Sequence, residues 1–117
     1  MIKSTYSTTE STHRDIIDFV KAAKSGDSNF KVIDLGGGVN GWTSEIADVI
    51  VDINVSDTQS TLQADICQEK DYAKLISFVE QHGLFDYCIC THTLEDLYNP
   101  FLALNYMPRI ATRQPLL

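Results

Sequence analysis

The sequence predicts a three-layer α/β fold built on a short, mostly parallel sheet of about four strands. Short apolar runs alternate along the chain with segments of helical periodicity, the pattern expected for parallel strands joined by crossover helices. A glycine cluster follows the first apolar run directly, as in a buried strand that enters a tight turn. The 117 residues, 44% hydrophobic and 21% charged, are enough for one ordinary domain with a modest core.

The N-terminal region divides into an arm and a helix. Residues 1–11 are rich in Ser and Thr and carry little apolar surface, so we expect a flexible arm. The folded domain is expected to span residues 12–117. It opens with a helix over residues 12–25 that ends at Gly26. The apolar positions at helical spacing that predict this helix are Ile16, Ile17, Phe19, Val20 and Ala23.

The remaining elements follow in alternation. The apolar, β-branched and aromatic content of four short runs predicts strands, and helical spacing predicts the helices between them. The segment after the glycine cluster has room for only about two helical turns, which is shorter than a usual crossover helix. The predicted strands are residues 30–35, 49–53, 61–66 and 84–91, and the predicted helices are residues 41–47, 72–82 and 94–111.

Composition and charge exclude several classes of function. The net charge is −7 and the nine Lys and Arg residues form no basic stripe, so no nucleic-acid partner is expected. No apolar run approaches the roughly 20 residues that span a bilayer, and the polar start lacks a secretory signal. We therefore expect no membrane association and a cytoplasmic location.

The cysteines and histidines predict no metal site. The three cysteines form an odd set without a CxxC spacing, which argues against a disulfide framework and fits a reducing compartment. Cys88, Cys90 and His92 share one face of the predicted fourth strand, but no second cluster supplies further ligands. We expect the two thiols to belong to the core. His13 and His82 are expected at the surface.

The segment from Asp34 to Gly41 (DLGGGVNG) carries most of the functional signal. Glycines at a strand end let the backbone turn sharply and approach a ligand closely. Gly36, Gly38 and Gly41 satisfy the pattern GxGxxG of dinucleotide-binding turns, although a glycine turn with no ligand has the same appearance. Asp34 lies inside an apolar run, so its carboxylate must be hydrogen-bonded structurally or serve a ligand.

Four segments in order resemble class I S-adenosylmethionine-dependent methyltransferases, which have a Rossmann-like fold. The segment VIDLGGG is similar to the acidic-x-Gly-x-Gly signature of that family, and VIVD at 49–52 to the strand that ends in a ribose-binding acid. QADI at 63–66 resembles the segment whose Asp faces the adenine. FDYCICTHTLEDLYNP at 85–100 is similar to the fourth strand and the loop after it.

The resemblance implies a set of ligand contacts, with S-adenosylmethionine as the cofactor. Asp52 would accept hydrogen bonds from the ribose and Asp65 from the adenine amino group, while Ile53 and Ile66 would contact the ring faces. The structural alternatives are that Asp52 caps a loop and Asp65 a turn. Gly36 and Gly38 would admit the methionine portion, with Gly37 between them in the cofactor-binding turn, and Asp34 would orient the turn or receive the amino group of the ligand. His92 would touch the ligand or act as a base, or else anchor its loop, and no catalytic residue can be named.

The resemblance implies methyl transfer to an unidentified acceptor, expected to be a small molecule. It breaks off after residues 109–111, because no glycine turn or strand follows where the family has a fifth strand. We therefore expect an exposed edge on the fourth strand, covered by a homodimer, a partner chain or further parts of a longer protein. Two alternatives remain: a non-catalytic methyltransferase-like half domain that acts as a binding module, and a nicotinamide-dependent oxidoreductase. The second is disfavoured because Asp52 follows the glycines sooner than the expected roughly 20 residues.

Overall fold

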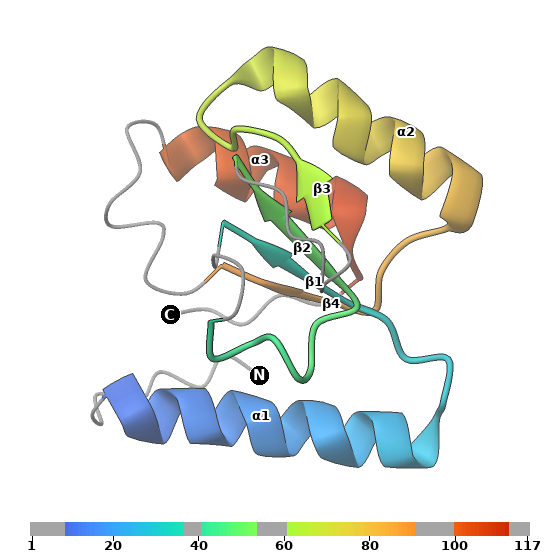
Figure 1. Cartoon of the computed structure of the whole chain (residues 1–117). Coiled ribbons are helices and arrows are strands. Elements are labelled where there is room, and N and C mark those ends of the chain that lie inside the picture. Colours follow the sequence, from blue (N-terminus) through green and yellow to red (C-terminus); the bar gives the residue numbers. More distant parts are fainter. Residues whose placement is uncertain (1–8, 37–40, 54–60, 91–99, 113–117) are drawn as a thin grey trace.

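The computed structural model describes residues 9–36, 41–53, 61–90 and 100–112 and has an α/β fold (Figure 1). Its sheet contains four parallel strands in the order β3-β2-β1-β4. The predicted fold class is thereby confirmed at the level of a parallel α/β sheet covered by helices. The elements are α1 (Thr9–Gly26), β1 (Val32–Leu35), β2 (Val49–Asp52), β3 (Thr61–Gln63), the 3-10 helix η1 (Glu69–Asp71), α2 (Tyr72–His82), β4 (Tyr87–Ile89) and α3 (Pro100–Ile110).

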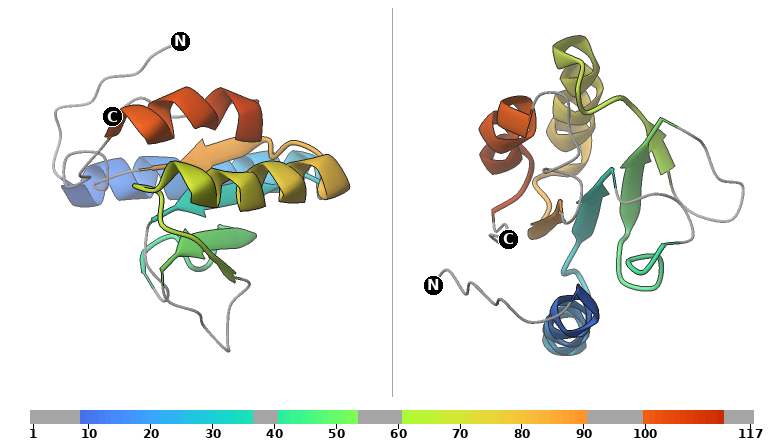
Figure 2. Two further views of the ribbon diagram at one scale, coloured as in Figure 1. Left: turned by 90° about the horizontal axis from the view of Figure 1, so that it is seen from above. Right: turned by 90° about the vertical axis from the view of Figure 1, so that its left-hand side faces the viewer.

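The sheet lies between two layers of helix. Figures 1 and 2 show α1 alone against one face, with α2 and α3 side by side against the other. Successive residues of a strand point to opposite faces, so each strand supplies both layers. In β1, Val32 packs in the apolar cluster beneath α1, whereas Ile33 and Leu35 pack in the cluster beneath α2 and α3. Burial on both faces explains why the strands read as continuous apolar runs.

The helix α2 coincides with the prediction over residues 72–82. Its buried positions are Tyr72 and Leu75, and Ile76 and Val79 pack partly against the same cluster. Gly83 ends the helix with φ of 91°, and its amide donates to the carbonyl of Val79 at 2.7 Å. A positive φ is easily adopted only by glycine, which accounts for the sharp stop.

The start of α1 differs from the prediction. The helix begins at Thr9, so the last three residues of the predicted arm, 9–11, belong to the helix. Ile16 and Val20 are buried against the sheet, which confirms the predicted apolar face, but Phe19 remains 41% exposed. Ser and Thr are weaker helix formers than Leu or Ala but are tolerated where the rest of the helix packs well.

The connection between β1 and β2 contains no helix in its described part, residues 41–47, which corrects the prediction for that segment. Three backbone hydrogen bonds shape it into turns, donated by the amides of Ser44, Ile46 and Ala47 at 2.9–3.1 Å. Seven residues cannot complete enough helical turns to offset the cost of helix nucleation. This connection is held by α1 instead, through contacts described below.

The outer edge of β4 is partly paired. Phe85, just before β4, forms an isolated parallel bridge with Ala111, just after α3. The amide of Phe85 donates to the carbonyl of Ile110 at 2.9 Å, and the amide of Thr112 donates to the carbonyl of Phe85 at 3.0 Å. The chain after α3 therefore returns alongside β4, and the edge that the sequence predicts to be open is covered at its amino end.

No helix within the described ranges has both the length and the apolar character needed to cross a lipid bilayer.

Candidate functional site

The predicted ligand residues lie at the edge of the sheet where the parallel strands end. Asp34 and Gly36 belong to the end of β1, Asp52 and Ile53 to the end of β2, and Asp65 follows β3. In the strand order β3-β2-β1-β4, the chain moves from β1 outward to β2 and β3 and then crosses back to form β4 on the other side of β1. Such a reversal opens a crevice outside the carboxyl ends of the strands, where open α/β sheets bind their ligands.

Gly36 joins the ends of β1 and β2. Its φ is 78°, in the left-handed region that favours glycine, and its amide donates to the carbonyl of Val51 at 2.7 Å. A side chain at this position would strain the turn. The hydrogen bond places Gly36 beside the residue that follows Val51, so the turn and Asp52 are neighbours across the strand ends.

Asp34 and Thr43 form a buried polar pair beneath the turn. Both residues are only 1% exposed, and the Thr43 hydroxyl donates a hydrogen bond to the Asp34 carboxylate. They are the buried polar or charged residues of the described part of the chain. Because an unpartnered carboxylate is costly to bury, Thr43 stabilises Asp34 in its place. The structure thus supports the structural interpretation of Asp34, as the residue that ties the strand end to the β1–β2 connection.

Asp52 and Ile53 are accessible at the end of β2. The Asp52 side chain accepts a hydrogen bond from the amide of Ile53 at 2.7 Å, and Ile53 is 60% exposed. The Ile53 carbonyl accepts from the Gln63 side chain at 3.0 Å, which fixes the backbone here against β3. A carboxylate next to an exposed aliphatic side chain offers a polar and an apolar contact to the same ligand.

Asp65 and Ile66 have structural roles in the described chain. Asp65 accepts the amide of Cys67 at 2.9 Å through its side chain, and its own amide donates to the Asp71 carboxylate at 2.7 Å. These bonds are typical of an Asp that forms a turn. Ile66 is 6% exposed and packs in the cluster beneath α2 and α3, so little of it is available to a ligand.

Three predicted ligand residues, Gly37, Gly38 and His92, lie outside the described residues.

Cys88 in β4 and Cys90 directly after it are core residues. Cys88 and Cys90 are 0% and 4% exposed, and burial raises the pKa of the Cys90 thiol from 9.0 to about 12 and that of Cys88 well above 9.0. Thiols of such high pKa are neutral near pH 7 and are poor metal ligands. Among the described residues there is no group of three potential ligands that could hold a metal ion.

Alkaline pH is expected to destabilise the fold. Burial raises the pKa of Tyr87 from 10.0 to about 12, in the same direction as the thiols. The unfolded chain therefore loses these protons at lower pH than the folded chain, so the contribution of these groups to the free energy of unfolding is constant below about pH 9 and falls between about pH 9 and 12. Each group contributes a slope of about 1.4 kcal/mol per pH unit within its window.

Urea denaturation at intervals from pH 7.5 to pH 10.5 would measure this slope. The variant Cys90→Ala provides the control, because it is expected to show a shallower alkaline loss whatever its stability at neutral pH. A free energy of unfolding that stays constant throughout this range would contradict the burial of these groups.

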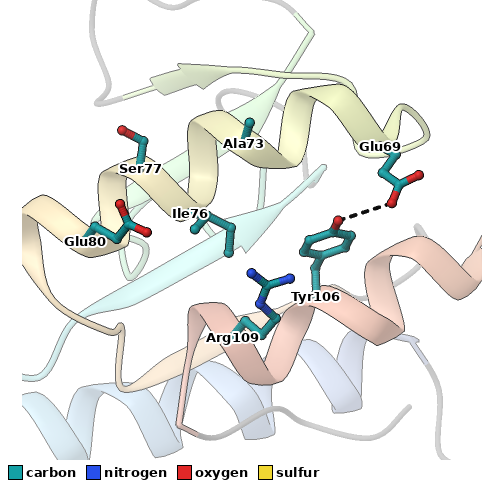
Figure 3. Close-up of a pocket in the computed structure, with 7 residues that line it drawn as sticks. All are labelled: Glu69, Ala73, Ile76, Ser77, Glu80, Tyr106 and Arg109. Carbon is teal, nitrogen blue, oxygen red and sulfur yellow. Dashed lines mark hydrogen bonds between the residues drawn. The ribbon is translucent and has the colours of Figure 1, made fainter.

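A groove with a volume of about 300 Å³ lies between α2 and α3 (Figure 3). The Tyr106 hydroxyl donates to Glu69 at 3.4 Å, and the Arg109 guanidinium lies 5.1 Å from the centroid of the Tyr106 ring. None of the predicted ligand residues lines this groove, so it is a separate feature of the helical layer. Its lining residues are Glu69, Ala73, Ile76, Ser77, Glu80, Tyr106 and Arg109.

Comparison with known proteins supplies no relative: no family model, no curated protein and no solved structure matches this chain. The parallel sheet and its strand order are consistent with a Rossmann-like layout without being specific to it.

Two features of the site are not predicted by the sequence. Thr43 was not recognised as a partner of Asp34, because a lone threonine in a short connection carries no distinguishing pattern. His13 was expected at the surface, but it is half-buried and stacks on Trp42, with ring centroids 3.9 Å apart and an interplanar angle of 7°. Trp42 also packs against the apolar cluster beneath α1.

Proposed function

We propose that this chain binds S-adenosylmethionine at the carboxyl edge of its sheet and transfers the methyl group to a small-molecule acceptor. The observation that carries the proposal is the junction of the β1 and β2 ends, where the positive-φ turn at Gly36 is hydrogen-bonded to Val51, next to Asp52 and the exposed Ile53. The resemblance of four ordered sequence segments to class I methyltransferases adds to it.

The residues at this junction fit the chemistry of the cofactor. Gly36 has no side chain to obstruct a ligand that approaches the turn. Asp52 can accept from the two ribose hydroxyls while retaining its bond to the Ile53 amide, because each carboxylate oxygen has two acceptor positions. Ile53 supplies apolar contact beside it. When bound, the cofactor supplies an activated methyl group on a sulfonium, and the protein's part is to hold donor and acceptor in line.

The proposal predicts a specific loss of affinity in Asp52→Ala. Charge-assisted hydrogen bonds contribute about 1.5–3 kcal/mol, so the affinity for S-adenosylhomocysteine is expected to fall by roughly 10- to 150-fold. Calorimetric titration of the purified parent and variant chains with S-adenosylhomocysteine and with NAD measures this loss of affinity. Asp18→Ala is the matched control, because Asp18 is an exposed carboxylate on α1 and its loss should leave the affinity unchanged.

The same titration separates the alternatives. Binding of NAD without S-adenosylhomocysteine would favour the nicotinamide-dependent alternative, and binding of neither would refute both cofactor hypotheses. If S-adenosylhomocysteine binds, the chain is then incubated with methyl-labelled S-adenosylmethionine and small-molecule extracts. Absence of labelled product across those extracts would favour the non-catalytic binding module.

A further inference from the structure

The helix α1 contacts the β1–β2 connection at three levels along its length. Near its start, His13 stacks on Trp42. In its middle, Ile16 and Val20 share an apolar cluster with Ile46. In its last two turns, lysines meet the two acids of the connection, as Lys21 lies 3.6 Å from Glu45 and Lys24 lies 2.6 Å from Asp48.

These contacts differ in strength. The pair Lys21–Glu45 is more than half exposed on both sides, so it adds little to stability. Lys24 is better enclosed, and its ion pair with Asp48 fixes the connection where it enters β2. Lys24 also donates to the carbonyl of Phe30, just before β1, at 3.0 Å. The stack of His13 on Trp42 is the corresponding contact at the end that leaves the glycine turn.

The connection depends on α1 because its described part contains turns and no helix that could pack by itself. Trp42 is followed directly by Thr43, whose hydroxyl holds the Asp34 carboxylate beneath the glycine turn. A rigid aromatic stack one residue away limits the movement of Thr43. The contacts therefore form a continuous path from α1 to the end of β1.

We propose that α1 positions the ligand-binding end of β1 and that His13 is the positioning residue, acting through Trp42 and Thr43. The ligand part of this inference rests on the proposed function. The structural part of the inference does not rest on the proposed function, because it concerns the order of the β1–β2 connection in the protein without ligand.

Three variants of α1 test the proposal. His13→Ala removes the stack, and His13→Phe keeps an aromatic ring at the same position. Phe19→Ala is the matched control. Phe19 packs on Phe30 and Tyr87, with ring centroids 6.3 and 5.0 Å away, so its replacement weakens the packing of α1 away from the connection. Thermal unfolding of each variant records its overall stability.

The first measurement is made without ligand. Hydrogen exchange is followed at the amides of Ser44, Ile46 and Ala47, which are hydrogen-bonded within the connection. In His13→Ala these amides are expected to exchange about threefold to tenfold faster, whereas His13→Phe should stay within about twofold of the parent protein. Phe19→Ala should lower the thermal midpoint and leave the three amides within the same limit.

The second measurement is the affinity for S-adenosylhomocysteine. His13→Ala is expected to weaken it by about threefold to tenfold, and His13→Phe to restore it. Equal effects of the two substitutions, or equal effects of His13→Ala and Phe19→Ala on exchange, would overturn the proposal. If the parent protein binds no S-adenosylhomocysteine but the exchange pattern is as expected, the positioning role stands and the proposed function fails.

Discussion

Replacement of Leu75 by alanine is expected to lower the free energy of unfolding by about 2–5 kcal/mol. Leu75 is 1% exposed and belongs to the cluster that joins α2 and α3 to the sheet, so its removal leaves a cavity that neighbouring side chains only partly fill. A domain of this size has a total stability of about 5–15 kcal/mol, so the loss would be a large fraction of it. Urea denaturation followed by far-ultraviolet circular dichroism measures the change.

Ser77→Ala on the same helix is the control for Leu75→Ala. Ser77 is exposed, and alanine is a good helix former, so this change should alter the free energy of unfolding by no more than about 0.5 kcal/mol. Equal effects of the two substitutions would mean that α2 does not cover the sheet with the face that carries Leu75.

Replacement of Asp34 by alanine is expected to lower the free energy of unfolding by about 1.5–3 kcal/mol. The substitution leaves the buried Thr43 hydroxyl without the carboxylate that accepts its hydrogen bond. Asp34→Asn should cost less, since it preserves the size of the side chain and one acceptor oxygen.

A double-mutant cycle isolates the contribution of this pair. Thr43→Val removes the hydroxyl at similar volume, and it should be less costly in the Asp34→Ala background than in the parent protein. The expected coupling is about 0.5–3 kcal/mol by urea denaturation. Strictly additive effects would show that the two side chains do not depend on each other.

Local patterns account for the parts of the fold that could be predicted. The spacing of Leu75, Ile76 and Val79 defines α2 without reference to the rest of the chain, and Gly83 marks its end. The interiors of the strands could also be predicted, because burial on both faces requires continuous apolar residues. The β1–β2 connection could not be predicted, because its shape depends on α1 and its own residues are too few to determine a helix.

The candidate site likewise contains residues that local sequence predicts and residue pairs that it does not predict. Gly36 and Asp52 were predicted because a glycine turn and an acid after a strand are local signals. The partnerships of Asp34 with Thr43 and of His13 with Trp42 join separate segments, and composition alone does not reveal such pairs. The resemblance implies a ligand contact for Ile66, whereas its side chain is 6% exposed and packs in the core.

The position of β4 in the sheet has a consequence for how the protein folds. β4 pairs with β1 at one edge of the sheet, and the amide of Lys31 donates to the Asp86 carboxylate across 55 residues of sequence. A ribosome that synthesises this chain releases β1, β2 and β3 before β4 has emerged. Because such distant pairings close slowly, the early strands wait with an unpaired hydrophobic edge. We therefore expect folding to be rate-limited by the addition of β4 to the exposed edge of β1.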